Sequence, residues 1–120
     1  MKIPEWSSYD TQMCQLGDHH WSVSRLVELS KDLKVMDIPL DHLYLYYRFQ
    51  RLSLRDMAMH INAINAADLS YPIIMDEDGE IMDGRHRVIK ALINGDKTIK
   101  AVRFDENPSP CKVDSEQKLG

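Results

Sequence analysis

The chain has 120 residues, of which 43% are hydrophobic and 28% are charged, as is usual for a globular domain. This length provides one modest hydrophobic core, so we expect a single domain. The formal net charge of -4 argues against a general polyanion binder, because sequence-independent DNA binding requires a surplus of Lys and Arg. DNA is therefore a possible partner that the net charge does not support, and any basic site must be local.

The sequence also bears on the compartment and on the use of its cysteines. The N-terminal residues include no apolar run like that of a signal peptide. The sequence also contains no stretch of about 18 apolar residues, the length needed to span a membrane. We expect a cytoplasmic protein with no membrane partner, for which a homo-oligomer is possible. Cys14 and Cys111 lie near opposite ends without a paired motif, so we expect reduced thiols and assign neither a catalytic role.

An irregular arm and an amphipathic helix are expected at the start of the chain. Residues 1–21 are polar and show no sustained period, so we expect an arm without regular structure, in which Trp6 and Tyr9 dock onto the body. Apolar residues then recur at helical spacing, and either Ser22 or Ser24 is available as the N-cap. The apolar positions of this helix are Val23, Leu26, Val27 and Leu33.

A strand and a second helix follow. Residues 38–45 are rich in strand-forming side chains and include Pro39, which is tolerated at the edge of a sheet. Ser53 and Asp56 then have the spacing of a capping box, with Asp in the place of the usual Glu. The helix that they open keeps a regular apolar spacing through Leu54, Met57, Ala58, Ile61 and Ile64.

The second half of the chain predicts a hairpin, a short helix and a final strand. Residues 71–75 and 80–82 are apolar segments separated by a turn rich in Asp and Gly. A helix begins near Arg85 and ends at Gly95, where glycine suits a left-handed C-cap. Residues 98–104 have the composition of a strand.

The element order places an α+β domain at residues 22–104: helix, strand, helix, two short strands, helix, strand. Residues 105–120 contain two prolines and many polar side chains without a core-forming period. We therefore expect them to form a flexible tail.

The strongest functional feature is the turn Asp83-Gly84-Arg85-His86-Arg87. It delivers the chain from a strand into a helix, where unpaired backbone N–H groups converge and carry a partial charge of roughly +0.5. Gly84 removes the Cβ that would obstruct an approaching anion, and the three residues after it place cationic or hydrogen-bonding side chains in the first helical turn. The turn therefore predicts a phosphate site.

Further roles can be assigned around this turn. Lys90 lies four residues after His86 and three after Arg87, so it extends the same helical face. Asp83 could hold Mg²⁺ beside phosphate oxygens or, together with His86, act as the acid or base of a phosphoryl transfer. The simpler alternative is a turn and helix cap whose basic side chains are solvated.

The segment from Tyr71 to Arg87, with the helix and strand that follow it, resembles the ParB/sulfiredoxin superfamily, and residues 22–104 fit the order of its elements. The resemblance implies an α+β fold with a small mixed sheet and helices packed around it. It also implies that Gly84, His86 and Arg87 bind nucleotide phosphates. The corresponding turn binds CTP in the partition proteins, ATP in sulfiredoxin and ADP in the related free-serine kinases. A nucleoside di- or triphosphate with Mg²⁺ is the ligand that the resemblance implies.

Departures from the family narrow this interpretation. Arg85 stands where sulfiredoxin has its nucleophilic cysteine, which argues against thiol chemistry. The turn of the partition proteins reads Gly-Glu-Arg-Arg, and we expect no room here for their helix-turn-helix and dimerisation regions. The kinase turn, Asp-Gly-His-His-Arg, matches at every position except Arg85.

The expected function is therefore nucleotide binding, either with Mg²⁺-dependent hydrolysis or phosphoryl transfer, or as a non-catalytic nucleotide- or nucleic-acid-binding regulatory module. The nuclease activity ascribed to ParB-like domains is a weaker option, because the sequence shows no cluster of carboxylates for two metal ions.

Two other patterns give weaker signals. Residues 44–51 interleave aromatic side chains with Arg48 and Arg51, which could stack on a base and contact phosphate. A strand end whose alternate aromatic side chains lie in the core is the simpler explanation. His19 and His20 lie near Cys14, but adjacent histidines seldom converge on one ion, so no structural metal is expected.

Overall fold

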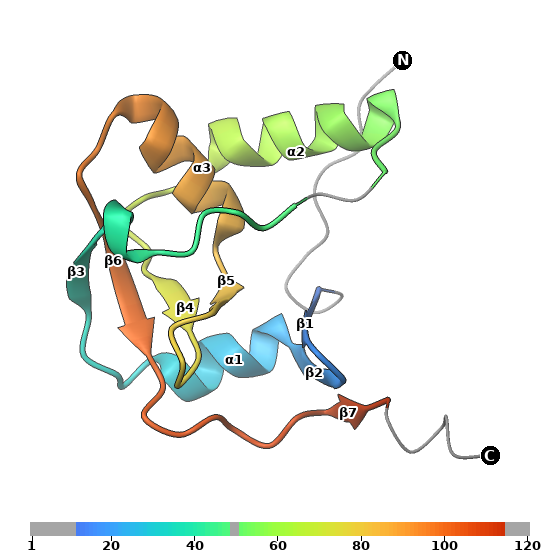
Figure 1. The fold of residues 1–120 in the computed structure, drawn as a ribbon, viewed down its shortest axis with the longest axis vertical. Helices are drawn as coiled ribbons and strands as arrows, with labels where there is room; N and C mark the ends of the chain where they lie inside the picture. The colour runs from blue at the N-terminus through green and yellow to red at the C-terminus, as the bar shows by residue number, and fades with distance from the viewer. Residues whose placement is uncertain (1–11, 49–50, 115–120) are drawn as a thin grey trace.

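The computed structural model describes residues 12–48 and 51–114 as an α+β fold with two sheets and three α-helices (Figure 1). The predicted α+β class is confirmed, and the docking of Trp6 and Tyr9 lies outside the described residues. The elements in chain order are β1 (Met13–Leu16), β2 (His19–Ser22), α1 (Val23–Ser30), β3 (Met36–Pro39), a 3₁₀ turn (Leu40–His42), α2 (Leu54–Ala66), β4 (Ile73–Met75), β5 (Ile81–Asp83), α3 (Arg85–Asn94), β6 (Thr98–Arg103) and β7 (Lys112–Val113).

A four-stranded mixed sheet, in the order β3-β6-β4-β5, forms the centre of the molecule. β4 pairs antiparallel with β5 and parallel with β6, so the predicted hairpin and final strand are confirmed. Every residue of β4 is buried, and its side chains alternate between two hydrophobic clusters. Ile73 and Met75 belong to one cluster and Ile74 to the other.

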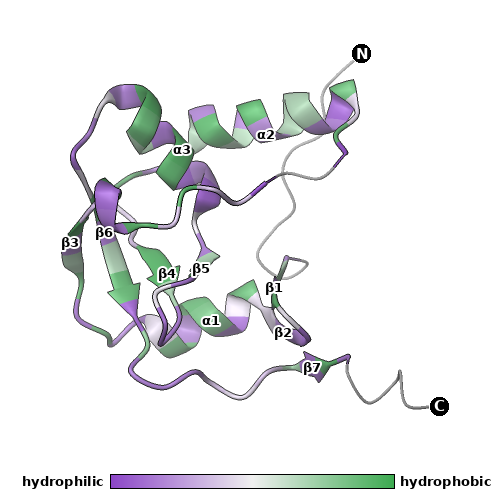
Figure 2. Cartoon of the chain, in the orientation of Figure 1, coloured by the Kyte–Doolittle hydropathy of each residue, from purple (hydrophilic) through white to green (hydrophobic). Residues whose placement is uncertain are grey.

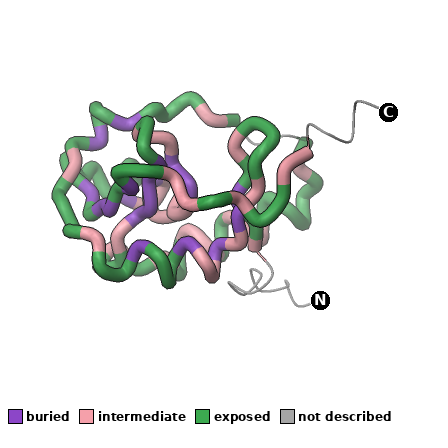
Figure 3. The backbone as a smooth tube through the Cα atoms, turned by 90° about the horizontal axis from the view of Figure 1, so that it is seen from below, coloured by how far each residue is buried: buried purple, intermediate pink, exposed green. Residues whose placement is uncertain are grey.

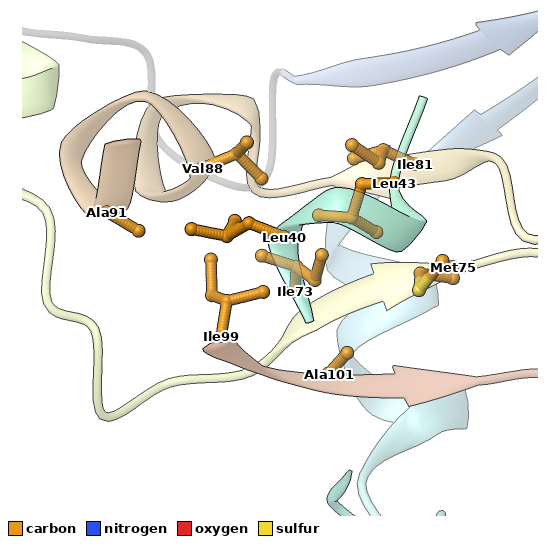
Figure 4. Packing of buried hydrophobic residues seen from close by; sticks show 9 residues of the cluster. All are labelled: Leu40, Leu43, Ile73, Met75, Ile81, Val88, Ala91, Ile99 and Ala101. Carbon is orange, nitrogen blue, oxygen red and sulfur yellow. The ribbon is translucent and has the colours of Figure 1, made fainter. Parts of the chain in front are cut away.

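The two clusters cover opposite faces of this sheet. The first brings α3 and the 3₁₀ turn against the strands, with Val88 and Ala91 pointing toward Ile73 and Ile99 (Figure 4). The second packs Leu26 of α1, Cys14 of β1 and Trp21 of β2 against the other face. Buried stretches along the chain are short and interrupted, as Figure 3 shows, which fits a core of modest size.

The strand predicted at residues 38–45 is shorter than expected. β3 is an edge strand that pairs with β6 and ends at Pro39, in agreement with the edge position predicted from that proline. The chain then makes the 3₁₀ turn, so the strand prediction is wrong beyond Pro39. Leu40 and Leu43 are both buried in the first cluster. Three residues apart, they would face opposite sides of a strand, whereas a three-residue turn brings them to the same side.

The second sheet joins the two ends of the described chain, in the order β1-β2-β7. Trp21 is 2% exposed, and its indole Nε1 donates to the carbonyl of Pro108 at 2.9 Å. The expectation of irregular structure is therefore wrong for residues 13–21, and the predicted tail contains a strand. These strands have only two to four residues, and alternation leaves just Cys14 and Trp21 buried in them, which gives a weak sequence signal.

The helix ends follow local chemistry. Ser22 is the N-cap of α1, because its Oγ accepts a hydrogen bond from the backbone N–H of Arg25 at 3.3 Å. The capping box of α2 is confirmed: the side chains of Ser53 and Asp56 each accept a bond from the other's backbone N–H. α3 ends at Gly95 in the left-handed conformation, as predicted.

The helix α2 packs against α3, and none of its residues is buried. Leu54 is 93% exposed, and Met57 and Ile61 of the same apolar stripe are also exposed. Hydrophobic and hydrophilic residues alternate along this helix (Figure 2). One side of α2 is therefore held by α3 while its most regular apolar stripe faces outward.

Candidate functional site

The turn from β5 into α3 depends on Gly84. This residue has φ 111° and ψ 19°, in the left-handed region that side chains rarely adopt. A Cβ added here would lie 2.5 Å from Cγ2 of Ile73, which is fully buried in the central sheet. The turn is thus pressed directly onto the sheet, which fixes where α3 begins.

The N-terminus of α3 has no side-chain cap and no acidic residue in its first turn. The other two helices begin at serine caps, whereas here the first residues are Arg85, His86 and Arg87. The first helical hydrogen bond runs from the N–H of Val88 to the carbonyl of Gly84 at 3.0 Å. The N–H groups that precede Val88 have no carbonyl within α3 to bond.

This turn lies in the wall of a cleft of about 560 Å³. Three segments that are far apart in sequence form most of the cleft wall: the β5–α3 turn, residues 12–15 at the start of β1, and the C-terminal half of α2. Its lining residues are Gln12, Met13, Cys14, Gln15, Val23, His60, Ala63, Ala66, Ala67, Ile81, Met82, Asp83, Gly84, Arg85, His86 and Arg87. All residues of the predicted turn therefore face one cavity.

Asp83 and Arg87 form an ion pair across the turn. The Oδ2 of Asp83 and the Nη2 of Arg87 are 2.8 Å apart, and the two side chains are only 13% and 11% exposed. The carboxylate that we expected to act as a metal ligand or base is thus bound to one of the expected phosphate ligands. The pair orients the Arg87 guanidinium and partly neutralises it.

His86 is hydrogen-bonded to His60 of α2. The Nε2 of His86 and the Nδ1 of His60 are 2.8 Å apart. Burial, the neighbouring His60 and the charge of Arg87 lower the pKa of His86 to about 4, so His86 is neutral at pH 7. His60 was missed from the sequence, because only the packing of α2 against α3 brings it to the turn.

Arg85 lies over the ring of Tyr47, with 4.3 Å between the guanidinium carbon and the ring centroid. The hydroxyl of Tyr47 donates to the carboxylate of Glu80 and accepts from the N–H of Ile81 at 3.2 Å. Burial and the Glu80 contact raise the pKa of Tyr47 to about 12. Tyr47 therefore fixes the position of the Arg85 guanidinium while remaining protonated at pH 7.

The other basic residues predicted for the site lie elsewhere. The Nζ of Lys90 donates to the carbonyls of Asn65 and Ala67 at 3.0 and 2.6 Å, where it caps the C-terminus of α2. Arg48 lines a separate pocket of about 70 Å³ together with Arg85. Arg51 is exposed and lines neither cavity.

The cysteine and histidine side chains near the start of the chain have structural surroundings. Cys14 lies in the cleft wall, where burial raises the pKa of its thiol to about 11, so the thiol is protonated at pH 7. His20 is bound instead to the carboxylate of Asp114, at 2.7 Å. Among residues 12–48 and 51–114, no group of three or more His, Cys, Asp or Glu side chains is placed to hold a metal ion.

No protein-family model, curated protein or solved structure matches the chain. The relation to the ParB/sulfiredoxin superfamily therefore stays a prediction from the sequence. No helix in the described ranges is both long and apolar enough to cross a membrane.

Proposed function

We propose that the cleft binds the phosphate groups of a nucleotide, in a cytoplasmic domain of the ParB/sulfiredoxin type. One observation carries the proposal: the uncapped N-terminus of α3, with its Gly84 turn, lies in the wall of a cleft of about 560 Å³. That volume is within the roughly 300–1,000 Å³ typical of small-molecule sites. The cleft also contains both an apolar wall, from the alanines of α2, and polar groups, as such sites usually do.

The residues of the turn would divide the binding between them. The backbone N–H groups at the start of α3 would donate to phosphate oxygens, and Gly84 would let the ligand approach the backbone. Of the two arginines in the turn, Arg87 is paired with a carboxylate and Arg85 is not, within residues 12–48 and 51–114, so Arg85 would supply the free positive charge. Arg87, held by Asp83, would present its remaining N–H groups at a fixed angle.

The geometry favours a non-catalytic role, in which the domain binds a nucleotide without hydrolysing it or transferring its phosphate. Asp83, the residue expected to act as base or Mg²⁺ ligand, is engaged by Arg87 at 2.8 Å. A carboxylate held in such a pair is less free to turn toward a substrate or to enter a metal shell. The described residues bring no group of three His, Cys, Asp or Glu ligands together, so by themselves they do not fit a protein-held Mg²⁺.

Isothermal titration calorimetry with ATP, ADP and CTP, each with and without Mg²⁺, tests the proposal. Arg85→Ala should weaken binding about tenfold or more, because a hydrogen bond to a charged group contributes roughly 1.5–3 kcal/mol. Lys100→Ala is the matched control, since it removes one positive charge from an exposed position on β6, outside the cleft. Absence of binding by all three nucleotides at millimolar concentration, or equal binding by Arg85→Ala, would overturn the proposal.

Turnover is measured separately, as phosphate release by the wild type and by Asp83→Asn. If the domain is a non-catalytic module, both proteins should release phosphate at the background rate while still binding nucleotide. Release that depends on Asp83 would instead establish hydrolysis and assign this carboxylate a catalytic role.

A further inference from the structure

The cleft contains a pair of histidines from different helices. His60 of α2 and His86 of α3 both line the cavity, and their nearest ring nitrogens are 2.8 Å apart. Their ring centroids are 5.1 Å apart, with an angle of 51° between the planes. At this distance one nitrogen must donate and the other accept, so the pair holds a single proton between the rings.

Such a pair can take up one further proton but resists a second. The first added proton gives an imidazolium that donates to a neutral imidazole, which is a charge-assisted hydrogen bond. A second would place two like charges on rings whose centroids are about 5 Å apart. The pair therefore behaves as one titrating unit rather than two independent histidines.

The surroundings of the pair disfavour even the first added proton. Arg85 and Arg87 line the same cleft, Lys90 follows on α3, and the thiol of Cys14 on β1 is uncharged at pH 7. Asp83 is the acidic residue that lines the cleft, and its carboxylate is bound to Arg87. Positive neighbours and burial thus act in the same direction, consistent with the lowered pKa of His86.

We infer that the His60–His86 pair takes up one proton when a phosphate dianion enters the cleft, so that the site selects terminal phosphate groups over phosphodiesters. The inference rests on the proposed phosphate binding. A dianion beside the pair reverses the local field, and the protonated pair then adds one positive charge to the site. A diester, with one negative charge, supplies half of this effect, which favours free nucleotides over a nucleic-acid backbone.

Sulfate and methyl sulfate are matched probes for this step. They carry two charges and one charge respectively, and neither titrates in the range in which histidine does. The ring C–H signals of the histidines are followed by NMR from about pH 4 to pH 8. The titrations are made in sulfate, methyl sulfate and chloride at equal ionic strength.

In sulfate, the signals of His60 and His86 should move together in one step at higher pH than in chloride. Methyl sulfate should raise the midpoint pH of this step by less than sulfate does. The signals of the exposed His19 should follow the same curve in all three salts. The affinity for sulfate should rise about tenfold for each pH unit of acidification. This holds between the midpoint pH of the pair in sulfate and its lower midpoint pH in chloride, where the pair is protonated only when sulfate is bound. In His60→Gln, which cannot take up the proton, the joint step should be lost and His86 should titrate as a single group.

The outcomes separate this inference from the proposed function. If sulfate leaves the backbone amide signals at the start of α3 unchanged, no anion binds there, and both proposals fall. If those amide signals shift while the titrations of His60 and His86 are the same in sulfate and chloride, phosphate binding stands and the proton uptake is refuted. If sulfate and methyl sulfate raise the midpoint pH of the joint step equally, the selection for terminal phosphates is refuted.

Discussion

Replacing Gly84 by alanine should destabilise the protein through two separable effects. At φ 111° an L-residue is strained, which costs roughly 1–2 kcal/mol. The new Cβ would also lie 2.5 Å from Cγ2 and 2.9 Å from Cβ of Ile73, and displacing such a packed neighbour costs about 1–3 kcal/mol. The sum, about 2–5 kcal/mol, is a large share of the roughly 5–15 kcal/mol that holds a domain folded.

Gly95→Ala is the matched control, because Gly95 ends the same helix at φ 75°, but an added Cβ would meet no atom within 4 Å from the rest of the described chain beyond its own helix backbone and chain neighbours. It should show the backbone strain alone. At roughly 4 °C per kcal/mol for a domain of this size, Gly84→Ala should melt about 4–12 °C below Gly95→Ala in thermal unfolding followed by circular dichroism. Equal melting temperatures would show that the turn is not pressed onto Ile73 and would refute this reasoning.

Three further predictions concern residues that face or flank the cleft. Asp83→Asn and Arg87→Gln should each cost about 3 kcal/mol in urea unfolding because each leaves a nearly buried partner unpaired, and the double mutant should show a coupling of about 1–3 kcal/mol; additive costs would contradict the pair. Lys90→Met should lower the unfolding free energy by about 1–2 kcal/mol and leave the affinity for ATP unchanged, since Lys90 caps α2; a weakened affinity would instead return Lys90 to the phosphate site. The unfolded chain binds the histidine proton near pH 6.5 and the folded protein only near pH 4, so stability should fall as the pH drops through this window, by about 1–2 kcal/mol after allowance for partial exposure. His86→Gln should flatten that part of the stability profile, and an unchanged profile would argue against a neutral His86.

Local chemistry accounts for what could be predicted from the sequence. The capping box of Ser53 and Asp56 and the C-cap at Gly95 involve residues close together in the chain, and each of them is confirmed. The turn at Gly84 could be located for the same reason. The cleft in which it lies could not be predicted, since two of its three walls come from β1 and α2.

Pairing between distant segments explains most of what was missed. β2 pairs with β7 through His19 and Val113, and no local pattern in two short polar strands indicates that partnership. Lys90 has the spacing of a residue on the phosphate face, but the end of α2 offers its carbonyls at hydrogen-bond distance. His60 likewise acquires its neighbour only when two helices pack.

The sheet of β1, β2 and β7 supports one wall of the cleft from both ends of the described chain. Cutting the chain at 22 and 104 would remove all three strands, the cleft wall from Gln12 to Gln15 and the indole that covers Leu26. The contact between His20 and Asp114 joins residues 94 positions apart and helps to close this sheet. A segment limited to residues 22–104 would therefore lose part of the cleft wall, and deletions around β7 would act on a cleft formed largely by the start and middle of the chain.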